Sequence, residues 1–535
     1  MAKVNLDALI PREDFEIDDK VSSGLKKHTI SAEDIKSDSF FFQNLRKPDF
    51  QRETNEWEPE RVVELIRSFV GGELIPAVIL WRSQGGYLFV IDGSHRLSAI
   101  AAWINNDYGD GQASQDFFEG VLPSEQREVA TATRLLVNEK IGSYRAHRAA
   151  LDNKDGLTQI IAEQAPKLND QKELAARIVE QARNLGSLAV QLQWVEGDIS
   201  KAEGSFFKIN QQAAPIDKTE LKLLRDRRKP ASVAARAIIR SGFGHKYWSK
   251  FSATRQKQIR TIATEVYQAL FTPLLTNPIK TLDLPIAGKI SSAQTLPLVV
   301  DMISIVVASD GGRPTFEEDD KSGEDTINVL KRVRDLVLTI NGNHPGSLGL
   351  HPAVYFYSQD GRFKSSSFLG MIKFVAELVK RKKLNEFTTA RKRFEAFVLE
   401  FDFLAQQINR KLRTADRSYP FIANFFQLAL DGIHNGITDA KIVASIKEHQ
   451  DFNYLVSARP KVSTSKIGKA FDSETKSEVF IRSAINAVPK CGICSGFVHM
   501  NSVSIDHKKR RQDGGAAVAA NGQLAHPYCN TGYKN

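Results

Sequence analysis

The sequence predicts a mostly helical α+β protein made of several domains. Its 535 residues exceed what one hydrophobic core usually organises, so two to four domains are expected. Apolar residues recur at helical spacing through most of residues 240–455, whereas residues 41–110 alternate helix and strand signals. All three cysteines lie between residues 491 and 529, which marks a further region near the C-terminal end.

The composition is that of a globular protein, with 42% hydrophobic and 25% charged residues. These values exclude wholesale disorder, collagen-like chains and small disulfide-stapled scaffolds. The longest apolar runs, such as Ala77–Trp81 and Leu296–Val300, are too short to cross a bilayer. Met1–Ile10 lacks the apolar core of a signal peptide. We therefore expect a soluble, cytoplasmic protein without a membrane partner.

The net charge of +10 is compatible with a nucleic-acid partner. Its distribution says more, because residues 476–535 hold eight Lys or Arg against three Asp or Glu and so carry half of the excess. We expect five segments along the chain: a lead-in over 1–34, an N-terminal domain over 35–235, a helical region over 236–455, a Ser/Thr/Lys-rich linker over 456–480 and a compact basic domain over 481–535.

The N-terminal domain is predicted from a helix, two strands and a second helix. Pro59 suits the first turn of a helix that ends at Gly71–Gly72. Ala77–Trp81 and Tyr87–Ile91 are apolar runs of strand length, and a helical pattern follows at Leu97–Ile104. A further strand is expected at Leu188–Val195.

The turn between the second strand and its helix reads Asp92-Gly93-Ser94-His95-Arg96. The first N–H groups of such a helix are unpaired and favour anions, phosphate above all. Gly93 allows close approach, His95 and Arg96 add donors, and Asp92 can cap the helix or position a metal or water. The alternative is a capped helix with Arg96 in a surface ion pair, and spacing alone leaves both open.

The wider context resembles a known family. Pro48–Arg52, Trp57, Val90–Leu97 and Phe206–Gln211 are similar to the DGQQR-motif domain of the ParB/sulfiredoxin-like group, found in GmrSD-type modification-dependent restriction enzymes. The resemblance covers roughly residues 35–225 and implies nucleotide binding or hydrolysis at the turn, coupled to DNA sensing. Arg52 could reach a phosphate or simply hold the strand start, and we assign it to the nucleotide site. Ser94-His95 departs from the usual Gln-Gln, and Ala213 stands in place of a Gly.

The C-terminal region contains a predicted zinc site. A second pair, His526-x₂-Cys529, follows Cys491-x₂-Cys494 after 31 intervening residues. Two such closely spaced pairs supply the four ligands that tetrahedral zinc takes from cysteine and histidine. A structural zinc would also help a short segment with little core of its own to fold. Free thiols beside a surface histidine are the alternative.

Asp506-His507 lies between the two halves of this ligand set. Adjacent residues of one strand point to opposite faces, so one can hold a divalent cation while the other acts as a base. His507 has the chemistry of a general base, and Asp506 is a hard oxygen ligand suited to Mg²⁺ or Mn²⁺. The amide oxygen of Asn530 can complete the cation site, and Asn521 can tie the loop to the backbone.

The order of these motifs over Lys490–Lys534 resembles the HNH nuclease family, whose fold is a ββα-metal finger. The resemblance implies that His507 is the general base, that Asp506 and Asn530 hold the cation, and that Asn521 is structural. His526 stands where the family usually has a third cysteine. Lys508-Lys509-Arg510-Arg511 replaces the usual residues after Asp-His and suits contact with a DNA backbone better than a merely solvated run.

The helical region shows no catalytic constellation. Its basic clusters, Lys380–Lys383 and Arg391–Arg393, could follow DNA or be ordinary solvated helix faces, and the sequence leaves both open.

The combined prediction is a metal-dependent DNA endonuclease of the modification-dependent restriction or anti-phage type, with structural Zn²⁺, catalytic Mg²⁺ or Mn²⁺, and gating by a nucleoside triphosphate. Hydrolysis of that nucleotide, a homo-oligomer and a partner protein of a defence system are left open. One alternative is a nucleotide-responsive DNA-binding regulator whose tail is only a zinc finger. Another is a stand-alone nicking or homing-type HNH enzyme.

Overall fold

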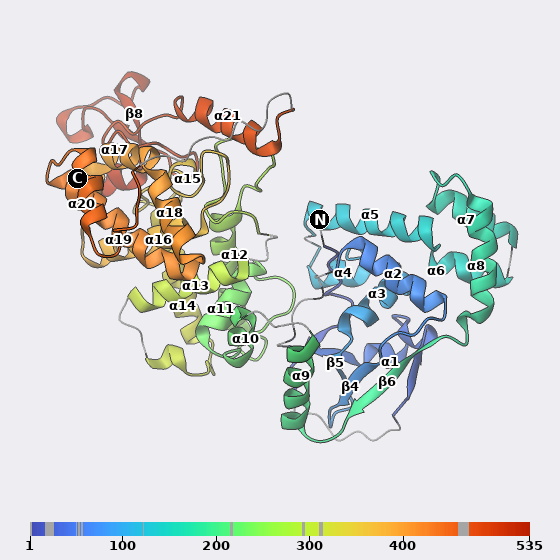
Figure 1. Ribbon diagram of the computed structural model, residues 1–535. Helices are drawn as coiled ribbons and strands as arrows, with labels where there is room; N and C mark the ends of the chain where they lie inside the picture. The colour runs from blue at the N-terminus through green and yellow to red at the C-terminus, as the bar shows by residue number, and fades with distance from the viewer. Residues whose placement is uncertain are drawn as a thin grey trace. The chain divides into compact units, whose positions relative to one another are not determined.

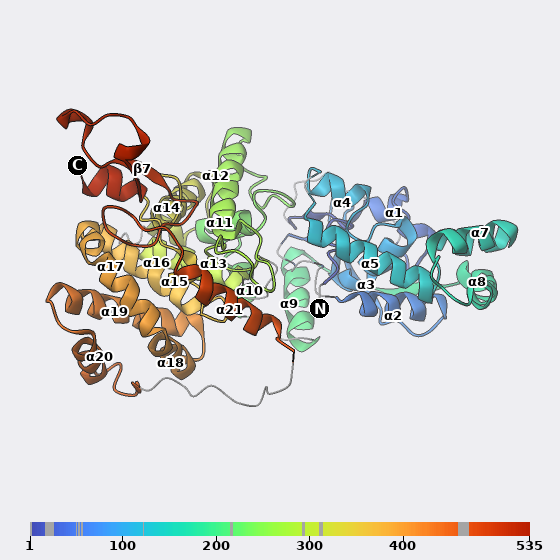
Figure 2. The same cartoon turned by 90° about the horizontal axis from the view of Figure 1, so that it is seen from above.

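The computed structural model describes residues 3–15, 26–49, 51, 54, 57–120, 122–152, 154–213, 218–290, 295–309, 314–457 and 470–534. The chain divides into two compact units (Figures 1 and 2). The first contains residues 1–227 and 243–246, and the second contains residues 228–242 and 247–535. Among the described helices, none combines the length and the apolar character needed to cross a membrane.

The first unit is built on a six-stranded mixed sheet in the order β1-β3-β5-β4-β6-β2. Neighbouring strands are parallel except for the pairs β4–β5 and β2–β6, which are antiparallel. The strands are β1 (Arg12–Glu13), β2 (Thr29–Ser31), β3 (Leu45–Pro48), β4 (Val78–Arg82), β5 (Leu88–Asp92) and β6 (Ala189–Val195).

The helices of the first unit follow the expected pattern around this sheet. They are η1 (Glu33–Ile35), α1 (Phe40–Gln43), α2 (Pro59–Val70), α3 (Ser94–Asn105), α4 (Gln112–Phe117), α5 (Ser124–Lys140), α6 (Tyr144–Asp152), α7 (Lys154–Gln164), α8 (Gln171–Leu185), α9 (Ile199–Ala213) and α10 (Lys218–Arg225). The predicted helix–strand–strand–helix order and the strand at 188–195 are therefore confirmed.

Both faces of the central strands are buried. Leu80 and Val90 join a core that includes residues of α2, α3 and α5, whereas Trp81 and Phe89 join a second core with Phe206 of α9. Adjacent residues therefore serve opposite cores, as the alternating side-chain directions of a strand require. This rigid strand pair holds the Asp92–Arg96 turn at the end of β5.

The second unit is mainly helical. Its α-helices are α11 (Pro230–Ile239), α12 (Ala253–Phe271), α13 (Thr295–Ser309), α14 (Glu324–Ile340), α15 (Pro352–Tyr355), α16 (Ser365–Lys380), α17 (Leu384–Glu400), α18 (Asp402–Leu412), α19 (Ala415–His434), α20 (Asp439–Glu448) and α21 (Ser473–Ile485). Helix α16 is central, because it packs against α13, α14 and α19 and buries most of its residues. α21 covers the last residues of the predicted linker.

The C-terminal residues belong to this same helical unit. They form the antiparallel pair β7 (Ser504–His507) and β8 (Gly522–Ala525), together with the short helices η3 (Arg511–Asp513), η4 (Ala519–Asn521) and η5 (Cys529–Tyr533). The remaining short helix of the unit is η2 (Pro314–Glu317). At the level of a mostly helical α+β protein with small sheets, the predicted fold class is confirmed.

Candidate functional site

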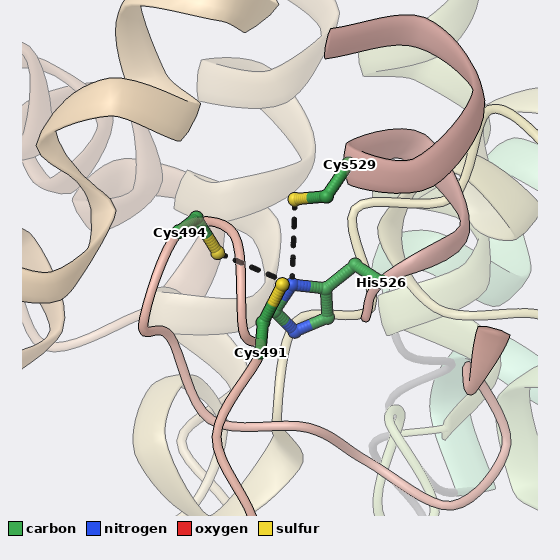
Figure 3. A group of neighbouring side chains, drawn as sticks. All are labelled: Cys491, Cys494, His526 and Cys529. Carbon is green, nitrogen blue, oxygen red and sulfur yellow. Dashed lines mark hydrogen bonds between the residues drawn. The ribbon is translucent and has the colours of Figure 1, made fainter. Parts of the chain in front are cut away.

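Four metal-binding side chains converge in the C-terminal region (Figure 3). The ligand atoms of Cys491, Cys494, His526 and Cys529 all lie within 4.8 Å of one another, and all four residues are buried. A tight turn presents the first pair, because the Cys491 N–H donates to the Gly496 carbonyl and the Ser495 N–H donates to the Cys491 carbonyl. The predicted set therefore comes together with the donor chemistry of a structural zinc site.

His526 is oriented as a neutral ligand. Its Nε2 lies 2.9 Å from the Phe497 carbonyl oxygen, to which the ring N–H donates. Its Nδ1 therefore carries the lone pair and faces the sulfurs of Cys494, at 3.3 Å, and Cys529, at 3.7 Å. Burial lowers the pKa of His526, which also keeps the ring neutral. A second partner that fixes the tautomer is the usual arrangement for a metal-bound histidine.

The three thiols cannot all ionise alone. Hydrogen bonds with the Cys494 and Cys529 thiols lower the pKa of Cys491, while the same contact raises the pKa of Cys494 to about 11. The pKa of Cys529 is raised for the same reason. A divalent cation would supply the positive charge that three thiolates need, so the cluster fits zinc on its own chemistry.

Arg391 and Glu395 of α17 support this cluster from the helical region. Both side chains are 1% exposed, and Arg391 Nε donates to Glu395 at 2.9 Å. Arg391 also donates to the Gly349 carbonyl at 3.0 Å, and its Nη1 lies 3.2 Å from His526 Nδ1. Glu395 accepts from the Phe497 N–H at 2.7 Å. For Arg391, both expectations for the cluster Arg391–Arg393 were wrong, because the residue is neither solvated nor available to DNA.

The β7–β8 pair presents the Asp-His dipeptide. Asp506 stands opposite Gln523 and is 5% exposed, while His507 stands opposite Gly522 and is half-buried. The two side chains take opposite faces of β7, as alternation along a strand requires. Among the described residues, no hydrogen-bond partner of the His507 imidazole is found.

Lys534 pairs directly with Asp506. Its Nζ lies 2.6 Å from Asp506 Oδ2 and donates at 2.6 Å to the His507 carbonyl oxygen. Gln523 Nε2 donates to the same carboxylate oxygen at 2.7 Å. Lys534 and Gln523 are not among the site residues predicted from the sequence, because no local spacing pattern links either of them to Asp506. A cation that uses this carboxylate must share it with, or displace, the Lys534 ammonium.

The two asparagines take different positions. Asn530 lies on η5 and donates at 2.7 Å to Ser504 Oγ, which shares with Asp506 one face of β7. Asn521 instead closes the loop after β7, because its side chain accepts from the Lys509 N–H at 2.9 Å and donates to the Lys509 and Ala516 carbonyls. Asn530 thus lies on the face of β7 that carries the Asp506 carboxylate, whereas Asn521 stabilises the backbone of the loop after β7.

The basic run after His507 is exposed throughout. Lys508 Nζ donates to the Ala520 carbonyl at 3.1 Å, and Arg510 donates to the Lys534 carbonyl at 2.7 Å. Lys509 and Arg511 extend the same exposed surface. The run therefore lies directly beside the segment that pairs with Asp506.

In the first unit, the Asp92–Arg96 turn has the predicted strand-to-helix geometry. Gly93 caps α3 with φ 97°, and a Cβ there would lie 2.8 Å from Val78 and 3.0 Å from Arg96, so only glycine fits without strain. Arg96 Nη2 donates to Asp92 at 2.7 Å and to the Ala77 carbonyl at 3.1 Å. The surface ion pair expected as the alternative for Arg96 is thus present.

Residues around the turn are held by a buried network. Gln51 Nε2 donates to Ser94 Oγ at 3.2 Å, and Arg12 donates to the Gln51 carbonyl. The His95 ring stacks on Trp57 with centroids 5.6 Å apart. Arg52, predicted to reach the same ligand, lies outside the described residues.

Comparisons with known families agree with the two regions just described. Residues 32–225 match the N-terminal domain of the GmrSD restriction endonuclease, and residues 491–535 match the HNH endonuclease. Among curated proteins, none matches this sequence. The chain therefore carries a region similar to the GmrSD N-terminal domain and, nearer its C-terminal end, a region similar to the HNH endonuclease domain.

Proposed function

We propose that this protein is a metal-dependent DNA endonuclease whose active site consists of His507, Asp506 and Asn530. The observation that carries the proposal is the β7–η5 arrangement. Asp506 lies on the same face of β7 as Ser504, the hydrogen-bond partner of Asn530. His507 is the next residue along the strand and lies on the opposite face. The two oxygen donors and the base thus belong to one small, rigid unit.

His507 is the group that takes a proton from water, and the resulting hydroxide attacks phosphorus while the P–O bond to the leaving oxygen breaks. A divalent cation held by Asp506 and Asn530 would stabilise the negative charge that develops on the leaving oxygen. Asn521 holds the loop that carries Lys508–Arg511, and those side chains bind flanking phosphates. We infer a ββα-metal fold for this finger, with Zn²⁺ held by the Cys₃His cluster in a structural role.

For the first unit, we propose a ParB/sulfiredoxin-like domain that binds a nucleoside triphosphate at Asp92, Gly93, His95, Arg96 and Arg52 and thereby gates cleavage. The positive φ of Gly93 and the lack of a side-chain cap on α3, whose residues the structure describes, support this part. The Arg96–Asp92 pair opposes it, because a phosphate must compete with a carboxylate 2.7 Å away. That pair favours the second candidate, an HNH nicking enzyme whose N-terminal domain only positions DNA.

Recognition of modified DNA in restriction or phage defence is part of the same proposal, because the N-terminal match is to a restriction endonuclease domain. The test is cleavage of modified and unmodified duplex DNA by the full chain, with Mg²⁺, with Mn²⁺ or with chelator, and with or without each nucleoside triphosphate. Metal-dependent cutting supports the nuclease, and nucleotide dependence supports gating. Cutting that ignores every nucleotide favours the positioning domain, whereas no cutting under any condition leaves the zinc-finger regulator.

A further inference from the structure

The connection between α16 and α17 is strongly basic. Lys380 ends α16, and Arg381, Lys382 and Lys383 follow before α17 begins. Arg381 pairs with Glu377 at 3.4 Å and Lys383 pairs with Glu386 at 3.0 Å. Lys380 and Lys382 are exposed and have no acidic partner within the described part of the chain. Two cations of the connection are therefore uncompensated.

The same end of α17 carries the nuclease helix η5. Asn385 accepts from the Tyr528 hydroxyl at 2.6 Å, and the Thr389 and Tyr533 hydroxyls lie 3.0 Å apart. The view in Figure 2 shows α17 beside the C-terminal segment, in agreement with these contacts. η5 includes Asn530, so the basic connection and the proposed cation site share one short stretch of structure.

Lys392 lies on the same stripe of α17. It follows Asn385 by seven residues and Thr389 by three, which places the three residues on one helical face. It is exposed and has no acidic partner among the described residues. Lys382 therefore precedes the residues of α17 that contact η5, and Lys392 follows them, about 12 Å beyond the start of the helix.

We propose that Lys380, Lys382 and Lys392 form, with η5, a phosphate-binding surface for the DNA duplex that flanks the cleavage position. The proposal rests on the nuclease function proposed above. Duplex DNA carries about one charge per 1.7 Å of axis, so cations spread over about 12 Å or more face several phosphates. Arg510, bonded to the Lys534 carbonyl, continues the positive surface on the nuclease side.

The chain offers a matched control at the other end of the same bundle. Ser366, in the first turn of α16, donates to Asn409 at 2.5 Å, next to the exposed Arg410. Lys380 follows Ser366 by fourteen residues of one helix, about 21 Å further along its axis. Arg410 and the nearby exposed Arg417 are therefore cations of the same domain that lie away from η5.

The experiment measures DNA affinity of the full chain against salt concentration by fluorescence anisotropy, in a His507→Ala background so that the duplex stays intact. Lys380→Gln, Lys382→Gln and Lys392→Gln are combined in one variant. Losing three phosphate contacts should reduce the slope of log affinity against log salt by roughly 2–3. The Arg410→Gln, Arg417→Gln control should keep the parent slope, and Lys→Arg at the three positions should also keep it.

Each other outcome has a definite meaning. An unchanged slope in the triple Gln variant overturns the surface while leaving the nuclease intact. An equal loss in the control shows diffuse attraction and also overturns it, as does loss in the Lys→Arg variant. If the parent binds no duplex and the wild type cuts none under any metal condition, the nuclease proposal fails together with this surface.

Discussion

The Cys₃His cluster and the Asp92–Arg96 turn differ in what their charges already contact. In the cluster, three sulfurs and a ring nitrogen face one another, and the three thiols can all be ionised only when a cation is bound. In the turn, Arg96 and Asp92 neutralise each other at 2.7 Å. Both motifs were visible in the sequence. A site whose donors repel one another without a ligand is stronger support for that ligand than a site whose groups satisfy each other.

Loss of zinc is the largest effect that we expect. Cys491→Ser removes one of four ligands, and structural zinc contributes on the order of 10 kcal/mol in small fingers. We expect loss of zinc by elemental analysis, unfolding of residues 490–534 and no cleavage, while the thermal transition of the first unit stays unchanged. Ile493→Val, between two ligands, is the control and should keep its zinc. Full activity of a zinc-free protein would refute the structural role.

Removing the proposed base comes next. His507→Ala should reduce the single-turnover cleavage rate by about 10²–10⁴, the usual contribution of general-base catalysis. Zinc content and melting temperature should not change, because the half-buried ring lies outside the Cys₃His cluster. His434→Ala, an exposed histidine on α19, should cut normally. Undiminished cutting by His507→Ala removes the HNH site assignment.

Acid should weaken the docking of the C-terminal segment through His499. Burial lowers the pKa of this residue to about 4, and its Nδ1 accepts from Asn341. The unfolded chain takes up a proton below about pH 6.5 while the folded ring stays neutral. The free energy of unfolding should therefore fall by up to about 3 kcal/mol between pH ~6.5 and ~4. Asp283, 3.4 Å away, reduces this loss because its carboxylate can pair with the charged ring.

Denaturant unfolding at several pH values checks this expectation. His499→Gln keeps an acceptor for Asn341 but does not titrate, so its stability should depend less on pH than that of the wild type. The difference between the two proteins isolates the histidine from acid release of zinc, which affects both. Parallel pH profiles would contradict the assignment.

Lys534 should compete with the divalent cation for Asp506. Because its ammonium lies 2.6 Å from the carboxylate, Lys534→Met should tighten Mn²⁺ binding about tenfold, equivalent to ~1.4 kcal/mol. Calorimetric titration of the zinc-loaded protein measures it directly. Lys509→Met, an exposed neighbour in the same loop, is the control. Weaker binding in Lys534→Met would show that the lysine supports the cation site rather than competing with it.

The smallest effect concerns the turn. Since Arg96 already pairs with Asp92, Arg96→Ala should weaken nucleotide binding by roughly threefold to tenfold, less than for an unpaired arginine. Parallel calorimetry and cleavage assays compare it with Arg67→Ala on α2. If the wild type binds no nucleotide at millimolar concentration, or if both variants match it in binding and in cleavage, the proposal that a nucleotide gates cleavage fails.

The sequence alone determined those parts of the molecule that depend on short-range spacing. Pro59, the Gly71–Gly72 stop and the run into Asp92-Gly93 predict α2, β4, β5 and α3 to within about three residues at each end, because caps, turns and strand lengths are local properties. Cysteine and histidine spacing likewise predicts the metal cluster, since each ligand pair belongs to one turn.

Only the tertiary structure decided which charges meet across long separations in the chain. Arg391 looked like part of a surface run, yet it is buried against His526, 135 residues away. Lys534 likewise pairs with Asp506, 28 residues away. Composition and periodicity carry no signal for such pairs, because a buried ion pair is set by the packing of whole helices and loops rather than by neighbouring residues.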